Sequence, residues 1–90
     1  MSEVEEKINE CIEELSQYKY FSTEVEVAIK AFERLKEQMR NLTRENIDEV
    51  LRGVEEGYRR SLAFADYIPR TVANLKFIKD WLEKKREELK

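Results

Sequence analysis

The chain has 90 residues, with no histidine and a single cysteine. A domain of this size holds one core, and we expect residues 1–90 to form a single helical-bundle domain. Without histidine there is no Ser/His or Cys/His nucleophile pair and no di-iron Glu-x-x-His motif, and one cysteine cannot ligate structural zinc. We therefore predict no catalytic residues, no cofactor and no metal site.

Composition favours short loops and amphipathic helices. Charged and apolar residues each make up 41%, net charge is -3, and there are two glycines and one proline. Such a chain is too apolar for disorder and has little material for β-turns. No leader and no apolar run of membrane-spanning length is recognised, so we expect a cytoplasmic protein. The abundance of Glu, Lys and Arg favours a thermophilic source.

The first element is predicted as a helix that Ser2 caps and that fades around residues 16–18. Its apolar residues recur at helical spacing and form one stripe, made of Val4, Ile8, Cys11, Ile12 and Leu15. Cys11 lies on this stripe, which favours a small buried hydrophobe over a reactive thiol.

A second helix is predicted from Glu24 to about Asn41, with Thr23 as its cap and Glu26 completing a capping box. Three aromatic residues precede it, namely Tyr18, Tyr20 and Phe21. We interpret them as core packing beneath a loop, with a ligand-stacking platform as the alternative.

Thr43 is the expected cap of a third helix, which should end near Tyr67 because Pro69 disfavours helical dihedrals at the residue before it. Small residues recur along it at four-residue spacing: Gly53, Gly57, Ser61 and Ala65. Each glycine inside a helix costs roughly 0.8–1 kcal/mol relative to alanine, so the pair needs a reason. Either another helix packs closely along this ridge, or the helix bends or breaks at Gly57.

The fourth helix begins at Pro69, with Thr71 as a competing cap, and runs almost to Lys90. It carries two apolar stripes, one of Val72, Leu75, Ile78, Leu82 and Leu89, the other of Ala73, Phe77 and Trp81. Together they cover more than half of the helix circumference, which exceeds what a helix packed on one side requires. Either this helix lies centrally, or its second stripe forms an interface.

Short connections between long helices favour antiparallel neighbours. The predicted fold class is therefore all-α, as an antiparallel up-down-up-down four-helix bundle with short loops. The alternative extends the third and fourth helices as an arm that pairs with another chain. Acidic residues dominate the first helix and basic residues are frequent in the last, which favours pairing of these two helices.

The function that these patterns favour is a non-enzymatic protein–protein interaction module, most simply a homodimer or a binder of another helical protein. The contact surfaces would be the fourth helix and the small-residue face of the third. Predicted interface residues are Gly53, Gly57, Phe64, Phe77 and Trp81.

Two other functions are open. A nucleic-acid-associated protein would use basic residues of the C-terminal half, namely Arg59, Arg60, Arg70, Lys76, Lys79, Lys84, Lys85 and Arg86. Acidic residues interrupt every basic run, which disfavours it. A Mg²⁺-dependent nucleotide hydrolase would need Glu10 and Glu13 to face Glu45 and Asp48 across a cleft.

Overall fold

The computed structural model describes residues 2–90, so Met1 of the predicted domain lies outside it. This part of the chain is helical and contains no β-strand, which confirms the all-α class. Its helices are α1 (Glu3–Ser16), α2 (Thr23–Arg40), α3 (Ile47–Ser61) and α4 (Pro69–Leu89), with a 3₁₀ turn η1 (Leu62–Phe64) after α3.

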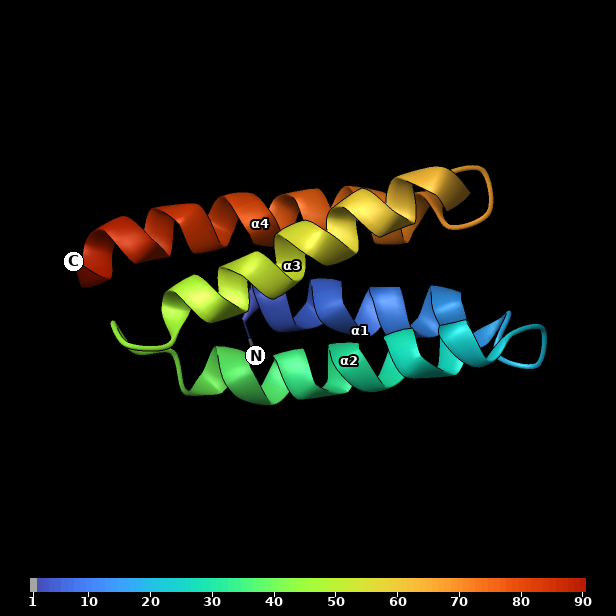
Figure 1. The fold of residues 1–90 in the computed structure, drawn as a ribbon, viewed down its shortest axis with the longest axis horizontal. Helices are drawn as coiled ribbons and strands as arrows, with labels where there is room; N and C mark the ends of the chain where they lie inside the picture. Colours follow the sequence, from blue (N-terminus) through green and yellow to red (C-terminus); the bar gives the residue numbers. More distant parts are fainter. Residues whose placement is uncertain (1) are drawn as a thin grey trace.

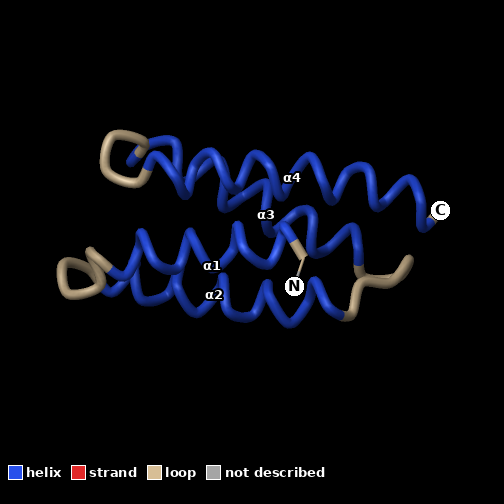
Figure 2. Tube along the Cα trace, turned by 180° about the vertical axis from the view of Figure 1, so that it is seen from behind, coloured by secondary structure: helices blue, strands red, loops and turns tan. Residues whose placement is uncertain are grey.

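The helices lie side by side in an elongated body that measures 41 × 21 × 20 Å. Loop 17–22 and the connection 62–68 lie at one end of it, and loop 41–46 lies at the other (Figures 1 and 2). The main helix contacts are α1 with α2, α3 with α4, and α1 with α4. Because α4 packs along both α1 and α3, the alternative of an extended arm made of the last two helices is wrong.

Side-chain caps set the beginnings of the first two helices. The Ser2 Oγ accepts a hydrogen bond of 3.1 Å from the Glu5 N–H, as predicted. At α2 the predicted cap was wrong by one residue. Ser22 has extended backbone dihedrals, and its Oγ accepts a 3.0 Å bond from the Glu24 N–H. Thr23 is therefore already the first residue of the helix.

Thr43 and Asn46 form a reciprocal pair before α3. The Thr43 N–H donates to the Asn46 side-chain oxygen over 2.8 Å, and the Asn46 N–H donates to the Thr43 hydroxyl over 3.1 Å. This pair stabilises a turn, so α3 begins at Ile47 and not directly after Thr43. The helix passes through Gly57 without a break and ends at Ser61, where the chain tightens into η1. The predicted end near Tyr67 was too late.

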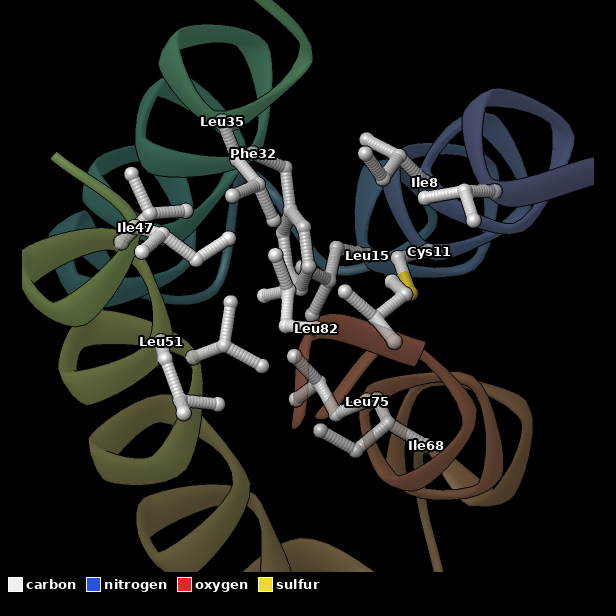
Figure 3. Packing of buried hydrophobic residues seen from close by; sticks show 14 residues of the cluster. Ile8, Cys11, Leu15, Phe32, Leu35, Ile47, Leu51, Ile68, Leu75 and Leu82 are labelled. Atoms are coloured by element: carbon white, nitrogen blue, oxygen red, sulfur yellow. The ribbon is translucent and has the colours of Figure 1, made fainter. Parts of the chain in front are cut away.

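Apolar side chains from all four helices converge on one core (Figure 3). The buried hydrophobic residues are Val4, Ile8, Cys11, Leu15, Phe32, Leu35, Ile47, Val50, Leu51, Val54, Ile68, Leu75, Ile78 and Leu82. Only Phe32 and Leu35 come from α2. Helix α2 therefore contributes the fewest buried side chains to the core, and α1, α3 and α4 contribute most of them.

Candidate interaction surface

The contact between α1 and α4, here called the seam, contains a buried carboxylate. Glu14 has only 8% of its surface exposed. Its carboxylate accepts hydrogen bonds from the Arg70 N–H at 3.1 Å and the Thr71 N–H at 2.6 Å. These groups belong to the first turn of α4, where backbone N–H groups lack partners within the helix. Glu14 therefore caps α4, which begins at Pro69 as predicted, and the competing cap candidate Thr71 is a buried residue of the first turn.

Further polar contacts extend the seam along α1. The Asn74 side-chain amide donates to the Lys7 carbonyl at 3.2 Å and to the Glu10 carboxylate at 3.0 Å. The hydrogen bond from Asn74 lowers the pKa of Glu10, and the positive charges of Arg70 and Lys7 lower it further. A lowered folded-state pKa makes this stabilisation complete at neutral pH and removes it as the pH falls through that pKa. These polar groups join two helices.

The acidic pairs proposed as a Mg²⁺ site lie far apart. Arg70 pairs with Glu10 at 3.5 Å and with Glu13 at 3.7 Å, near the start of α4. Asp48 instead pairs with Arg86 at 3.6 Å, near the end of α4. Sixteen helical residues separate these two arginines, which is roughly 24 Å at 1.5 Å per residue. Within residues 2–90 no cluster of metal-binding side chains forms, so the four carboxylates do not converge.

Acidic partners accompany the basic residues of α4. Lys76 lies 2.8 Å from Asp80, Lys79 lies 3.5 Å from Glu83, and Lys85 lies 3.6 Å from Glu88. These pairs lie within α4 and do not reach α1. The expected ion pairs between acidic α1 and basic α4 are instead formed by Arg70, at the start of α4, with Glu10 and Glu13. A phosphate backbone needs a continuous basic surface, which this interleaving of signs along α4 disfavours.

Cys11 is fully buried beneath the start of α4. Burial raises the pKa of its thiol to about 12, and the Sγ lies 4.0 Å from the Thr71 carbonyl oxygen. The thiolate is the nucleophilic form, and it is negligible at neutral pH when the pKa is this high. The structure therefore favours a small core residue over a reactive thiol.

The second apolar stripe of α4 is partly covered by the chain itself. Phe77 and Trp81 are half-buried and pack against the core. The ammonium group of Lys7 lies 5.4 Å from the centre of the Phe77 ring, and that of Lys85 lies 6.0 Å from the Trp81 ring. Because α4 contacts both α1 and α3, its central position accounts for much of the excess apolar surface.

The two glycines of α3 have different surroundings. A Cβ at Gly57 would lie 4.0 Å from the Leu75 Cδ2 of α4, whereas a Cβ at Gly53 would meet nothing within 4 Å. Gly57 therefore faces α4 of the same chain, and Gly53 faces open space. Within one chain, close approach by a neighbouring helix does not explain Gly53.

Replacing Gly53 by alanine is expected to raise the free energy of unfolding by about 0.5–1 kcal/mol, because alanine favours the helix and meets no obstacle. Chemical denaturation at low protein concentration measures this effect. The same variant tests the predicted small-residue contact between chains. A gain in stability together with weaker self-association would show that another chain packs on Gly53, and a gain alone would show a free surface.

Among residues 2–90, five of the six exposed large apolar side chains belong to loop 17–22 and the connection 62–68, two segments that lie at the same end of the molecule (Figure 1); the sixth is Val27 on α2. We call this set the aromatic end; it consists of Tyr20 (89% exposed), Phe21 (81%), Leu62 (48%), Phe64 (52%) and Tyr67 (66%). The Tyr18 hydroxyl donates a 3.1 Å hydrogen bond to the Tyr67 carbonyl and ties the two segments together. A shallow hollow beside Tyr20 and Phe21 is lined also by Lys19 and Glu26.

Sequence reasoning anticipated only Phe64 of this set. The interpretation of the aromatic cluster as core packing holds for Tyr18, which is half-buried against the core. It is wrong for Tyr20 and Phe21, which lie beyond the end of α1 and are exposed to solvent. Their position in the sequence could have indicated this exposure. Both residues come immediately before the cap of α2, beyond the end of α1, where no neighbouring helix continues to cover them.

No protein-family model, curated protein or solved structure matches the chain. None of the helices in residues 2–90 combines the length and the apolar character needed to cross a lipid bilayer.

Proposed function

We propose that this chain is a non-enzymatic, cytoplasmic protein–protein interaction module that associates with a second copy of itself. Its scaffold is an antiparallel up-down-up-down four-helix bundle, which the alternating ends of the three connections support (Figure 1). The observation that carries the proposal is the aromatic end, where five large apolar side chains are exposed on two segments at the same end of the molecule.

The size of this surface supports a binding role. An aromatic side chain buries about 150–250 Å² when it is fully covered. Scaled by the exposed fractions of its five residues, the aromatic end presents on the order of 600 Å² of side-chain surface to solvent. The largest apolar patch of an ordinary soluble monomer is about 300–600 Å² and is often functional. Leaving a patch of this size in water is costly, and covering it by another protein removes that cost.

A second surface is the one predicted from the sequence, formed by Gly53, Gly57, Phe77 and Trp81 together with Phe64, which also belongs to the aromatic end. In its favour, Gly53 has open space above it and both aromatic rings keep part of their surface exposed. Against it, Gly57 faces Leu75 of the same chain, and both rings are half-buried against the core. The aromatic end is therefore the preferred surface.

The proposal is tested by measuring molar mass across a dilution series of the full chain, by light scattering or sedimentation. We expect a dimer that dissociates on dilution. Trp81→Ala serves as the probe of the second surface: it should lower stability without changing the dissociation constant if the aromatic end is used. A chain that stays monomeric up to about millimolar concentration would overturn self-association.

A further inference from the structure

We infer that two copies associate end to end, each covering the aromatic end of the other, about a two-fold axis that sets loop 17–22 against the partner's connection 62–68. This inference rests on the proposed function and specifies its partner and geometry. It follows from three features of the aromatic end: its area, its rigidity and its charge pattern.

The area fits a modest dimer. If both copies cover roughly 600 Å² each, the contact removes about 1,200 Å² from water, which is the lower limit for specific and stable protein–protein interfaces. Two of the five side chains, Tyr20 and Tyr67, combine an apolar ring with a hydroxyl group. Such side chains are suited to the border of an interface, because the ring is covered while the hydroxyl group stays hydrated.

The two backbone segments that carry the aromatic end are connected before any partner binds. Tyr18 connects the two segments through its hydrogen bond to the Tyr67 carbonyl, and its ring lies 6.2 Å from the Phe21 ring. The Phe64 carbonyl accepts hydrogen bonds from the N–H groups of Tyr67 and Ile68 at 2.9 and 3.0 Å. A surface fixed by such contacts loses little conformational entropy on binding, which favours association.

The charges at this end are self-complementary in one orientation only. Loop 17–22 carries one charged residue, Lys19, and connection 62–68 carries one, Asp66, and both are exposed. One possible two-fold axis sets loop 17–22 against loop 17–22 of the partner, and connection 62–68 against connection 62–68, which brings like charges together. The perpendicular two-fold axis brings Lys19 of each copy to Asp66 of the other, twice per dimer. Charge complementarity of this kind selects orientation and register.

The helical turns next to these two segments also carry opposite charges, and the sign of each turn is opposite to that of the segment beside it. The first turn of α2 is acidic, with Glu24 and Glu26, and the last turn of α3 is basic, with Arg59 and Arg60. In the orientation that brings Lys19 to Asp66 of the partner, the acidic first turn of α2 in one copy lies on the same side as the basic last turn of α3 in the other. The outer ring of charges therefore favours the same two-fold axis as Lys19 and Asp66.

The first test replaces Phe21 by lysine and uses Ala31→Lys as the matched control. Ala31 is exposed in the middle of α2, so this variant adds the same charge away from the aromatic end. We expect Phe21→Lys to raise the dimer dissociation constant at least tenfold and Ala31→Lys to leave it within about twofold. Circular dichroism checks that both variants keep the helical fold, because neither site is buried.

The second test concerns orientation and uses Lys19→Glu and Asp66→Lys. Each variant alone places like charges opposite each other twice per dimer, and we expect it to dimerise about threefold to tenfold more weakly. An equimolar mixture of the two restores opposite charges at both contacts, so a mixed dimer should form with near wild-type affinity. Association that depends on Phe21 but is not restored by mixing would overturn the two-fold orientation.

The outcomes separate this inference from the proposed function. A wild-type chain that is monomeric throughout the dilution series defeats both. A wild-type dimer that Trp81→Ala or Gly53→Ala weakens, and that Phe21→Lys leaves unchanged, upholds self-association and overturns the end-to-end geometry. A dimer weakened by Phe21→Lys and restored by mixing Lys19→Glu with Asp66→Lys supports both.

Discussion

Replacing Glu14 by alanine is expected to lower the free energy of unfolding by about 2–4 kcal/mol, an unusually large effect for an acidic residue on a helical protein. The substitution leaves the N–H groups of Arg70 and Thr71 without their acceptor at the start of α4. A hydrogen bond to a charged group contributes about 1.5–3 kcal/mol, and loss of a helix cap costs about 0.5–2 kcal/mol. The site is buried, so water replaces the carboxylate poorly.

Glu13→Ala is the matched control, because Glu13 is the adjacent residue, its side chain is 76% exposed and it makes only a 3.7 Å ion pair with Arg70. We expect this variant to change stability by less than about 0.5 kcal/mol. Thermal and chemical denaturation measure both effects, and the Glu14 variant should melt roughly 10–25 °C lower than wild type. Equal effects of the two substitutions would show that Glu14 does not cap α4.

Leu82→Ala is expected to destabilise the fold by about 2–5 kcal/mol, because it opens a cavity among close-packed side chains. Leu82 is 0% exposed and belongs to the buried stripe of α4. Leu62→Ala removes the same atoms from a leucine that is 48% exposed, and this control should cost less than about 1 kcal/mol at a protein concentration at which the chain is monomeric, so that loss of the dimer contact does not contribute. Denaturation with guanidinium gives the two free energies on one scale. A cost at Leu82 no larger than at Leu62 would mean that the core is placed wrongly.

Those two leucines also show how far the sequence could predict the fold. Apolar spacing alone placed Leu82 on the same stripe as Leu75 and Ile78, which the structure buries, because a helical period of 3.6 residues determines which side chains share a face. The same reasoning located all four helices and the buried face of the first one. Helix boundaries were less predictable. Ser22 and Thr23 are both good caps by residue type, and only the backbone dihedrals distinguish them.

Glu14 could not have been predicted from local spacing. Its hydrogen-bond partners lie 56 and 57 residues away, so the cap exists only once α1 and α4 are packed together. Tyr20 and Phe21 posed the opposite problem. Hydrophobic residues are usually buried, but whether a residue beyond a helix end is covered depends on where the neighbouring segment 62–68 passes. Such placement is a property of the whole fold, which residue type does not encode.

The seam between α1 and α4 also bears on the route by which the chain folds. The contacts between α1 and α2, and between α3 and α4, join helices that are adjacent in sequence, so each hairpin can form rapidly. Docking of the two hairpins has to close a loop of more than 50 residues, which is the slower and entropically costlier step. The Glu14 cap belongs to this late step. We therefore expect the loss of this cap to act mainly by accelerating the separation of the hairpins, and to leave the formation of each hairpin unchanged.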